Sequence, residues 1–159
     1  MVSLTRVERT SDLELVATRS FNAPARVLFE AWTRPDQIMR WWTPDSFGIS
    51  FLSCETEART GGSYRYVFAH PELDQPMAFF GRYIEVTPPL RLVWTNEEDQ
   101  DGAVTTVTFE ENSGATAVVV HDLYPSKTAL DDAIASGSTG AWPEQFAQLA
   151  DLIAKPGAP

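Results

Sequence analysis

The chain has 159 residues, 43% of them hydrophobic, and a formal net charge of -10 from 12 Lys plus Arg against 22 Asp plus Glu. This length suits one domain with its own core, and the acidic balance argues against nucleic acid and anionic membrane surfaces as partners. Cys54 is the only cysteine in the sequence, and neither a signal peptide nor a membrane-spanning apolar run is predicted. We therefore expect a cytoplasmic protein without an intrachain disulfide.

The N-terminal part of the chain predicts one strand followed by two short helices. Residues 1–11 carry no apolar pattern and are expected to form an irregular lead-in. Apolar and polar residues then alternate over residues 13–21, which is the period of a strand with one buried face. Pro24 marks the start of a short helix that ends before Pro35, and residues 36–42 predict a second one.

Beyond residue 49 the sequence changes to short β-rich runs separated by turns rich in Gly, Pro, Asn and Asp. The six predicted strands are 49–57, 63–69, 77–86, 91–95, 104–110 and 116–122. Their connections are too short for parallel crossovers, so we expect an antiparallel meander. Tyr64, Tyr66 and Phe68 share one strand face, and we assign Phe79 on the next strand to the same side.

The C-terminal stretch, residues 126–155, predicts an amphipathic helix. Its buried face is formed at helical spacing by Leu130, Ile134, Trp142, Phe146, Leu149 and Ile153. Residues 137–140 and Pro143 interrupt the pattern, so we expect a kink or two segments on one axis. The element order predicts an α+β fold in which a curved antiparallel sheet of about seven strands holds a long C-terminal helix in its concave face.

Several short motifs occur in a recognisable order along the chain. They are Phe21-Asn22-Ala23-Pro24, Arg40-Trp41-Trp42, Gly61-Gly62 before an aromatic strand, and Phe80-Gly81-Arg82-Tyr83-Ile84-Glu85-Val86. Together they resemble the Hsp90 ATPase activator homologue-like branch of the START/Bet v 1-like (SRPBCC) superfamily, with a core at about residues 13–154 of a single domain, 1–159. The resemblance implies a helix-grip fold around an apolar cavity. Superfamily relatives bind lipids, steroids, polyketides or plant metabolites, some are cyclases or hydrolases, and the best-known member of the branch stimulates a chaperone ATPase.

The favoured hypothesis is a binding protein that holds a small apolar or aromatic molecule between helix and sheet. The candidate ligand-binding residues are Trp42, Phe47, Tyr64, Tyr66, Phe68, Met77, Phe79, Tyr83, Trp94, Trp142 and Phe146. Each of these side chains can instead belong to an ordinary core. Glu85 is a candidate acid, base or polar anchor, with an ion pair to Arg82 or Arg91 as the alternative. Arg59 is a candidate anchor for an anionic group, with a plain surface arginine as the alternative.

The sequence contains no recognised catalytic, cofactor or metal motif, so no catalytic residue, cofactor or metal site is predicted. The separations among His70, His121 and Cys54 do not match metal-ligand spacing, and the acidic residues of 97–101 are expected at a solvated hairpin tip. Two alternatives stay open. One is a cyclase- or hydrolase-type enzyme in which Tyr66, Glu85 or a histidine supplies acid or base, and the other is a chaperone-associated protein acting through its acidic surface. A protein partner or a homodimer is compatible with either.

Overall fold

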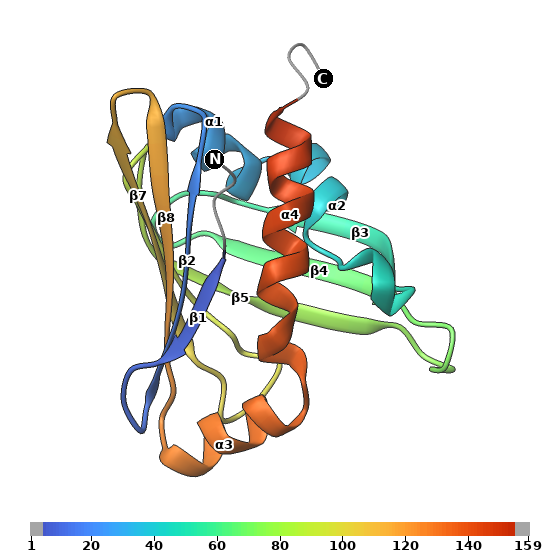
Figure 1. Ribbon diagram of the computed structural model, residues 1–159. Coiled ribbons are helices and arrows are strands. Elements are labelled where there is room, and N and C mark those ends of the chain that lie inside the picture. Colours follow the sequence, from blue (N-terminus) through green and yellow to red (C-terminus); the bar gives the residue numbers. More distant parts are fainter. Residues whose placement is uncertain (1–4, 155–159) are drawn as a thin grey trace.

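A computed structural model describes residues 5–154, and its strands form one open antiparallel sheet (Figure 1). In chain order they are β1 (Arg6–Arg9), β2 (Glu14–Phe21), β3 (Ser50–Thr56), β4 (Ser63–Ala69), β5 (Met77–Thr87), β6 (Arg91–Thr95), β7 (Val104–Asn112) and β8 (Ala115–Leu123). Their order within the sheet is β1-β2-β8-β7-β6-β5-β4-β3. The helices are α1 (Ala25–Thr33), α2 (Pro35–Trp41), α3 (Lys127–Ala135) and α4 (Trp142–Ile153), with 3₁₀ turns η1 (Asp45–Phe47) and η2 (Ser138–Ala141).

The sheet curves around the last helix, α4. In Figure 1, β2, β7 and β8 lie to one side of α4, while β3, β4 and β5 extend past its other side. Phe146 and Leu149 of α4 are fully buried, and Phe146 meets Phe21 of β2 edge to face with 5.6 Å between ring centroids. This is the helix-grip architecture that the sequence resemblance implies, with eight strands instead of about seven.

The additional strand is β1, and it corrects the expectation of an irregular lead-in over residues 1–11. β1 pairs with β2 in antiparallel register, with Arg6 opposite Thr18 and Arg9 opposite Leu15. All four residues of β1 are exposed. Neither face of β1 enters the core, so no apolar alternation marks it, and backbone hydrogen bonds to β2 hold it in place. Residues 1–4 lie outside the described part of the chain.

The burial of β4 follows the alternation of its sequence. Tyr64, Tyr66 and Phe68 of β4 are buried, whereas Arg65 between them is exposed. The ring of Phe79 on β5 lies 5.1 Å from that of Phe68, which confirms that both point to the same side of the sheet. The predicted strands coincide with β2 to β8 to within two residues at each end, because the turn residues between the β-rich runs mark where the strands stop.

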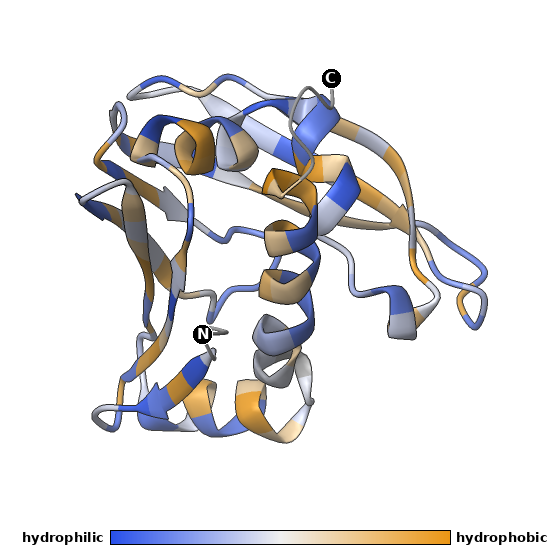
Figure 2. Cartoon of the chain, turned by 45° about the horizontal axis from the view of Figure 1, so that its top comes forward, coloured by the Kyte–Doolittle hydropathy of each residue, from blue (hydrophilic) through white to orange (hydrophobic). Residues whose placement is uncertain are grey.

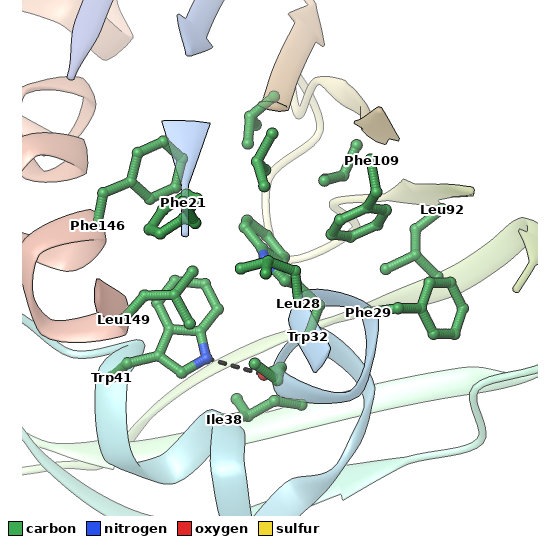
Figure 3. Close-up of a cluster of buried hydrophobic side chains, with 14 of the residues drawn as sticks. Phe21, Leu28, Phe29, Trp32, Ile38, Trp41, Leu92, Phe109, Phe146 and Leu149 are labelled. Atoms are coloured by element: carbon green, nitrogen blue, oxygen red, sulfur yellow. Dashed lines mark hydrogen bonds between the residues drawn. The ribbon is translucent and has the colours of Figure 1, made fainter. Parts of the chain in front are cut away.

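A proline joins α1 to α2 and leaves one helix carbonyl without its usual donor. Pro35 has no N–H, so the carbonyl of Ala31 cannot receive the hydrogen bond that a residue four positions later normally gives. The indole Nε1 of the fully buried Trp41 donates to this carbonyl at 2.8 Å (Figure 3). The bond compensates for the proline and fixes the direction in which the chain leaves α2.

The predicted C-terminal helix of residues 126–155 is two helices that do not share an axis. α3 runs across the lower end of the sheet in Figure 1, and α4 rises beside the sheet. The chain turns at Gly137, whose φ of 84° lies in the left-handed region that favours glycine. Because the turn redirects α3, Ile134 is 39% exposed instead of buried. Lys155, at the predicted end, lies outside the described residues.

Aromatic side chains from both ends of the chain make up much of the core. Figure 3 shows Phe21, Trp32, Phe109 and Phe146 converging between β2, α1, β7 and α4, and each is at most 3% exposed. Hydrophobic and hydrophilic positions alternate along the helices, as the colours of Figure 2 show. None of the described helices has the length and apolar composition needed to cross a bilayer.

Candidate functional site

A hollow of about 440 Å³ lies between the sheet and the C-terminal helices. Residues of β4 to β8, the segment that follows α2, the helix α3 and the start of α4 line it. Ala129, Ala133 and Ala141 contribute only methyl groups where the helices face the hollow. Larger side chains at these three positions would fill the space, so the small residues keep it open.

One side of the hollow is aromatic. The rings of Trp42 and Trp142 lie perpendicular to each other with centroids 6.0 Å apart, and Phe68 and Phe79 line the hollow from β4 and β5. The side chain of Gln145 donates from Nε2 to the carbonyl of Trp42, which ties the segment after α2 to α4. This bond holds the backbone of Trp42 beside the first turns of α4, on which Trp142 lies.

The structure brings most of the predicted ligand-binding residues to this region. The hollow is lined by Trp42, Phe47, Phe68, Met77, Phe79, Trp94 and Trp142. Tyr64, Tyr66 and Tyr83 line a small neighbouring cavity of about 10 Å³, and the fully buried Phe146 lines neither space. Whether these side chains contact a ligand stays a prediction.

The two predicted polar anchors lie outside both spaces. Glu85 pairs with Arg91 at 3.2 Å between Oε1 and Nε, and it accepts a hydrogen bond from Thr87 at 2.9 Å. Arg59 is exposed and lies 3.4 Å from a carboxylate oxygen of Glu57. For both residues the placement matches the structural alternative that the sequence left open.

The lining of the hollow also contains acidic side chains, which sequence reasoning did not predict. Its carboxylates are Glu98, Asp99, Asp101, Asp122 and Asp132. The first three belong to the loop between β6 and β7, which was expected to be a solvated hairpin tip. They are exposed as expected, but the loop folds over so that it also borders the hollow.

Asp122 is the carboxylate that strand geometry holds most firmly. Thr105 of β7 lies opposite it in the sheet and donates from Oγ1 to its Oδ1 at 2.6 Å. Thr105 in turn accepts from Nδ2 of Asn96 at 2.9 Å. Burial raises the pKa of Asp122 to about 6, and the bond from Thr105 offsets part of that rise.

A sequence signal for Asp122 existed in the alternation of β8. Thr116, Val118 and Val120 are fully buried, and Asp122 is the next residue on that face. An inward-facing carboxylate at the end of a core strand marks a polar position within an apolar enclosure. The strand was predicted correctly, but its last inward position was not considered.

The variant Asp122→Asn is expected to be more stable than the natural chain at pH 7, with a free energy of unfolding that is higher by about 1 to 2 kcal/mol. Because the folded protein raises this pKa from 3.8 to about 6, it binds more protons than the unfolded chain between these values. The contribution of this group to stability is therefore largest at low pH and declines as the pH rises through about 6. Urea unfolding of both proteins at pH 4 and pH 7 measures the difference. An equal difference at the two pH values would contradict the expectation.

Comparisons with known proteins add to this geometry. Residues 22–154 match the model of the family described as Activator of Hsp90 ATPase homolog 1-like protein. The comparison with curated proteins gives no match. Among solved structures, a Rhodobacter sphaeroides protein is 25% identical, has a TM-score of 0.85, and the alignment covers 94% of this chain and 97% of that one.

Two further structures share the fold at lower identity. A Nitrosomonas europaea protein is 20% identical with a TM-score of 0.82, covering 92% of this chain and 97% of that one. An AHSA1-like protein from Aeromonas hydrophila is 18% identical with a TM-score of 0.68, and the alignment covers 91% of this chain and 98% of that one. The same architecture therefore extends over nearly the whole length of these proteins.

Proposed function

The chain belongs to the Activator of Hsp90 ATPase homolog 1-like protein family, and from this premise we propose that it binds a small apolar or aromatic molecule in the hollow between the sheet and the C-terminal helices. The observation that carries the proposal is an unfilled space beside an otherwise dense aromatic core. Its volume of about 440 Å³ falls within the range of roughly 300 to 1,000 Å³ that is usual for ligand pockets.

The binding hypothesis is preferred to the enzymatic one in which Tyr66, Glu85 or a histidine supplies the acid or base, because of where these groups lie. Glu85 is engaged with Arg91 outside the hollow. Tyr66 is buried, and burial raises the pKa of its phenol well above the usual value. His121 is paired with Glu14, with 2.7 Å between Nε2 and Oε2. None of these three groups is among the residues that line the hollow.

Association with a chaperone is a second candidate function, and the family description favours it. Such a role requires an exposed surface and does not depend on the hollow. We propose that the acidic surface would make this contact, so stimulation of the ATPase of a purified Hsp90 should weaken as salt rises. Stimulation that is unaffected by salt would count against a charge-driven contact. A cytoplasmic location is part of the same proposal.

Replacing Phe79 by alanine is expected to weaken binding of a neutral hydrophobic probe, N-phenyl-1-naphthylamine, about tenfold, because the variant loses one aromatic wall of the hollow. Phe79 is 38% exposed, so its loss should leave the fold intact. Fluorescence titration of the probe measures the affinity.

The matched control is Ile84→Ala. Ile84 lies on the same strand, β5, is 52% exposed and does not line the hollow. The Ile84→Ala variant should bind the probe with the same affinity as the natural chain. Equal loss in both variants, or no saturable binding by the natural chain, would overturn the proposed function.

A further inference from the structure

The charges around the hollow all have one sign. Five carboxylate side chains line it, and among its described lining residues there is no Lys, Arg or His. The acids come from three separate elements, namely the loop between β6 and β7, the strand β8 and the helix α3. A ligand that packs against the rings of the hollow therefore also meets the negative potential of its carboxylates.

Asp122 is the acid best placed to contact such a ligand. Its Oδ1 accepts the bond from Thr105, and no described residue donates a hydrogen bond to its Oδ2. The residues paired with it on the two neighbouring strands supply no cation. Leu15 lies opposite on β2, the hydroxyl of Thr105 opposite on β7, and the charged side chains that share the hollow from α3 and from the β6–β7 loop are carboxylates.

Against the rise caused by burial, the charge of His121 lowers the pKa of the neighbouring Asp122, but among the described residues the hydrogen-bond partner of this imidazole is a different carboxylate. Side chains of consecutive strand residues point to opposite faces, and His121 pairs with Glu14 of β2 at 2.7 Å. Asp122 thus faces the hollow with one oxygen free to accept a bond. A largely buried carboxylate that accepts no hydrogen bond from a cation is costly, and a ligand that carries a positive charge would relieve that cost.

The aromatic side of the hollow also suits a cation. Trp42, Trp94 and Trp142 line it, and the face of an indole ring attracts an ammonium group more strongly than other aromatic faces do. A metal ion fits this arrangement poorly, because no three described His, Cys, Asp or Glu side chains are grouped closely enough to hold one. An organic cation with an apolar body can use both the rings and the carboxylates of the hollow.

We propose that the ligand is an amphipathic amine, an apolar or aromatic molecule whose protonated nitrogen donates to Oδ2 of Asp122 while its body packs against the tryptophans. The inference rests on the proposed function, since it names the chemical class that the same hollow takes. It also explains why the hollow combines rings with carboxylates and lacks basic residues.

The test compares two probes that differ in charge but hardly in shape, 2-(1-naphthyl)ethylammonium and 2-(1-naphthyl)ethanol, titrated calorimetrically at pH 7.5. The natural chain is expected to bind the ammonium at least about tenfold more tightly than the alcohol. In Asp122→Asn the ratio should fall to at most about a third of its natural value, because the remaining carboxylates of the hollow attract the ammonium more weakly, while the affinity for the alcohol stays within about twofold. The Asn side chain can still accept the bond from Thr105, so the fold is kept.

The control for net charge is Asp151→Asn. Asp151 is exposed on α4 and does not line the hollow, so this variant loses the same charge and should keep the full preference for the ammonium. Repeating the titration at about 1 M salt, where the Debye length is about 3 Å, separates contact from long-range attraction. A direct bond to Asp122 should retain most of the preference.

Each remaining result counts against a specific claim. Equal binding of the two probes by the natural chain would overturn the amine proposal and leave the binding function standing. A preference that is undiminished in Asp122→Asn, or that falls equally in Asp151→Asn, would show that Asp122 is not the contact. Failure of both probes to bind, together with failure of the neutral N-phenyl-1-naphthylamine, would overturn the proposed function itself.

Discussion

Replacing Trp32 by alanine is expected to lower the free energy of unfolding by about 3 to 5 kcal/mol. Trp32 of α1 is 2% exposed, and its ring lies at the centre of the aromatic core. Ring centroids within 4.7 to 6.4 Å of it belong to Trp41, Trp42, Trp94, Phe109, Trp142 and Phe146. Alanine would leave a cavity that these rings cannot close without leaving their present positions. Since natural domains are stable by only about 5 to 15 kcal/mol, the variant should be marginally folded.

Urea unfolding followed by circular dichroism measures the loss, and two variants act as controls. Leu52→Ala removes an aliphatic side chain that is 54% exposed and should cost less than about 1 kcal/mol. Trp32→Phe keeps a ring in the core and should cost clearly less than alanine. The indole Nε1 of Trp32 has no hydrogen-bond partner among the described residues, so phenylalanine forfeits no such bond. A Trp32→Ala protein as stable as Leu52→Ala would contradict the central position assigned to this ring.

The variant Gly81→Ala is expected to lose about 2 kcal/mol or more. Gly81 lies on β5, and a Cβ there would stand 2.1 Å from the carbonyl oxygen of Thr95 on β6. A backbone oxygen cannot rotate away as a flexible side chain can, so β5 and β6 must separate locally. That movement would strain two hydrogen bonds between β5 and the chain of β6. The backbone N–H of Arg82 donates to Oγ1 of Thr95 at 3.0 Å, and the N–H of Glu97, just after β6, donates to the carbonyl of Phe80 at 2.8 Å.

The matched control for this variant is Gly140→Ala. A Cβ at Gly140 would meet no atom within 4 Å, and its φ is not positive. The alanine should therefore be neutral or stabilise the protein by up to about 1 kcal/mol, because it restricts the unfolded chain. Thermal and urea unfolding should give free energies of unfolding for the two variants that differ by at least about 2 kcal/mol, with Gly81→Ala the less stable. Equal stabilities would show that β5 and β6 have room that the present geometry does not provide.

Sequence patterns predicted the elements that bury one face and missed the element that buries none. The rings of β4 alternate with exposed residues, so both the strand and the direction of Tyr64, Tyr66 and Phe68 followed from period two. β1 has four exposed residues and is held by pairing with β2. Its existence depends on a neighbouring strand edge, which no local pattern encodes.

The broken C-terminal helix shows a different limit. The glycines of residues 137–140 signalled an interruption, and Gly137 does adopt a left-handed conformation there. They could not indicate by how much α3 turns away from α4, because that angle depends on packing against the sheet. Ile134 was therefore assigned to a buried face but is 39% exposed.

The candidate site was predictable in its apolar part only. Rings such as Trp42, Phe79 and Trp94 could be proposed from composition and strand parity, because large apolar side chains gather either in a core or around a pocket. The acidic part depends on how the β6–β7 loop folds over the hollow and on Asp122 continuing the inner face of β8. Glu85, chosen for its neighbours in sequence, pairs with Arg91 elsewhere.

The position of β2 in the sheet has a consequence for the order in which the molecule can be completed. β2 pairs along its full length with β8, with Glu14 opposite Leu123 and Phe21 opposite Thr116. During synthesis the backbone edge of β2 that pairs with β8 therefore has no partner until residues 115–123 have left the ribosome. The large separation in sequence between β2 and β8 is typical of folds with a high contact order. Such folds form slowly, because closing a long loop costs entropy before its contacts stabilise the chain.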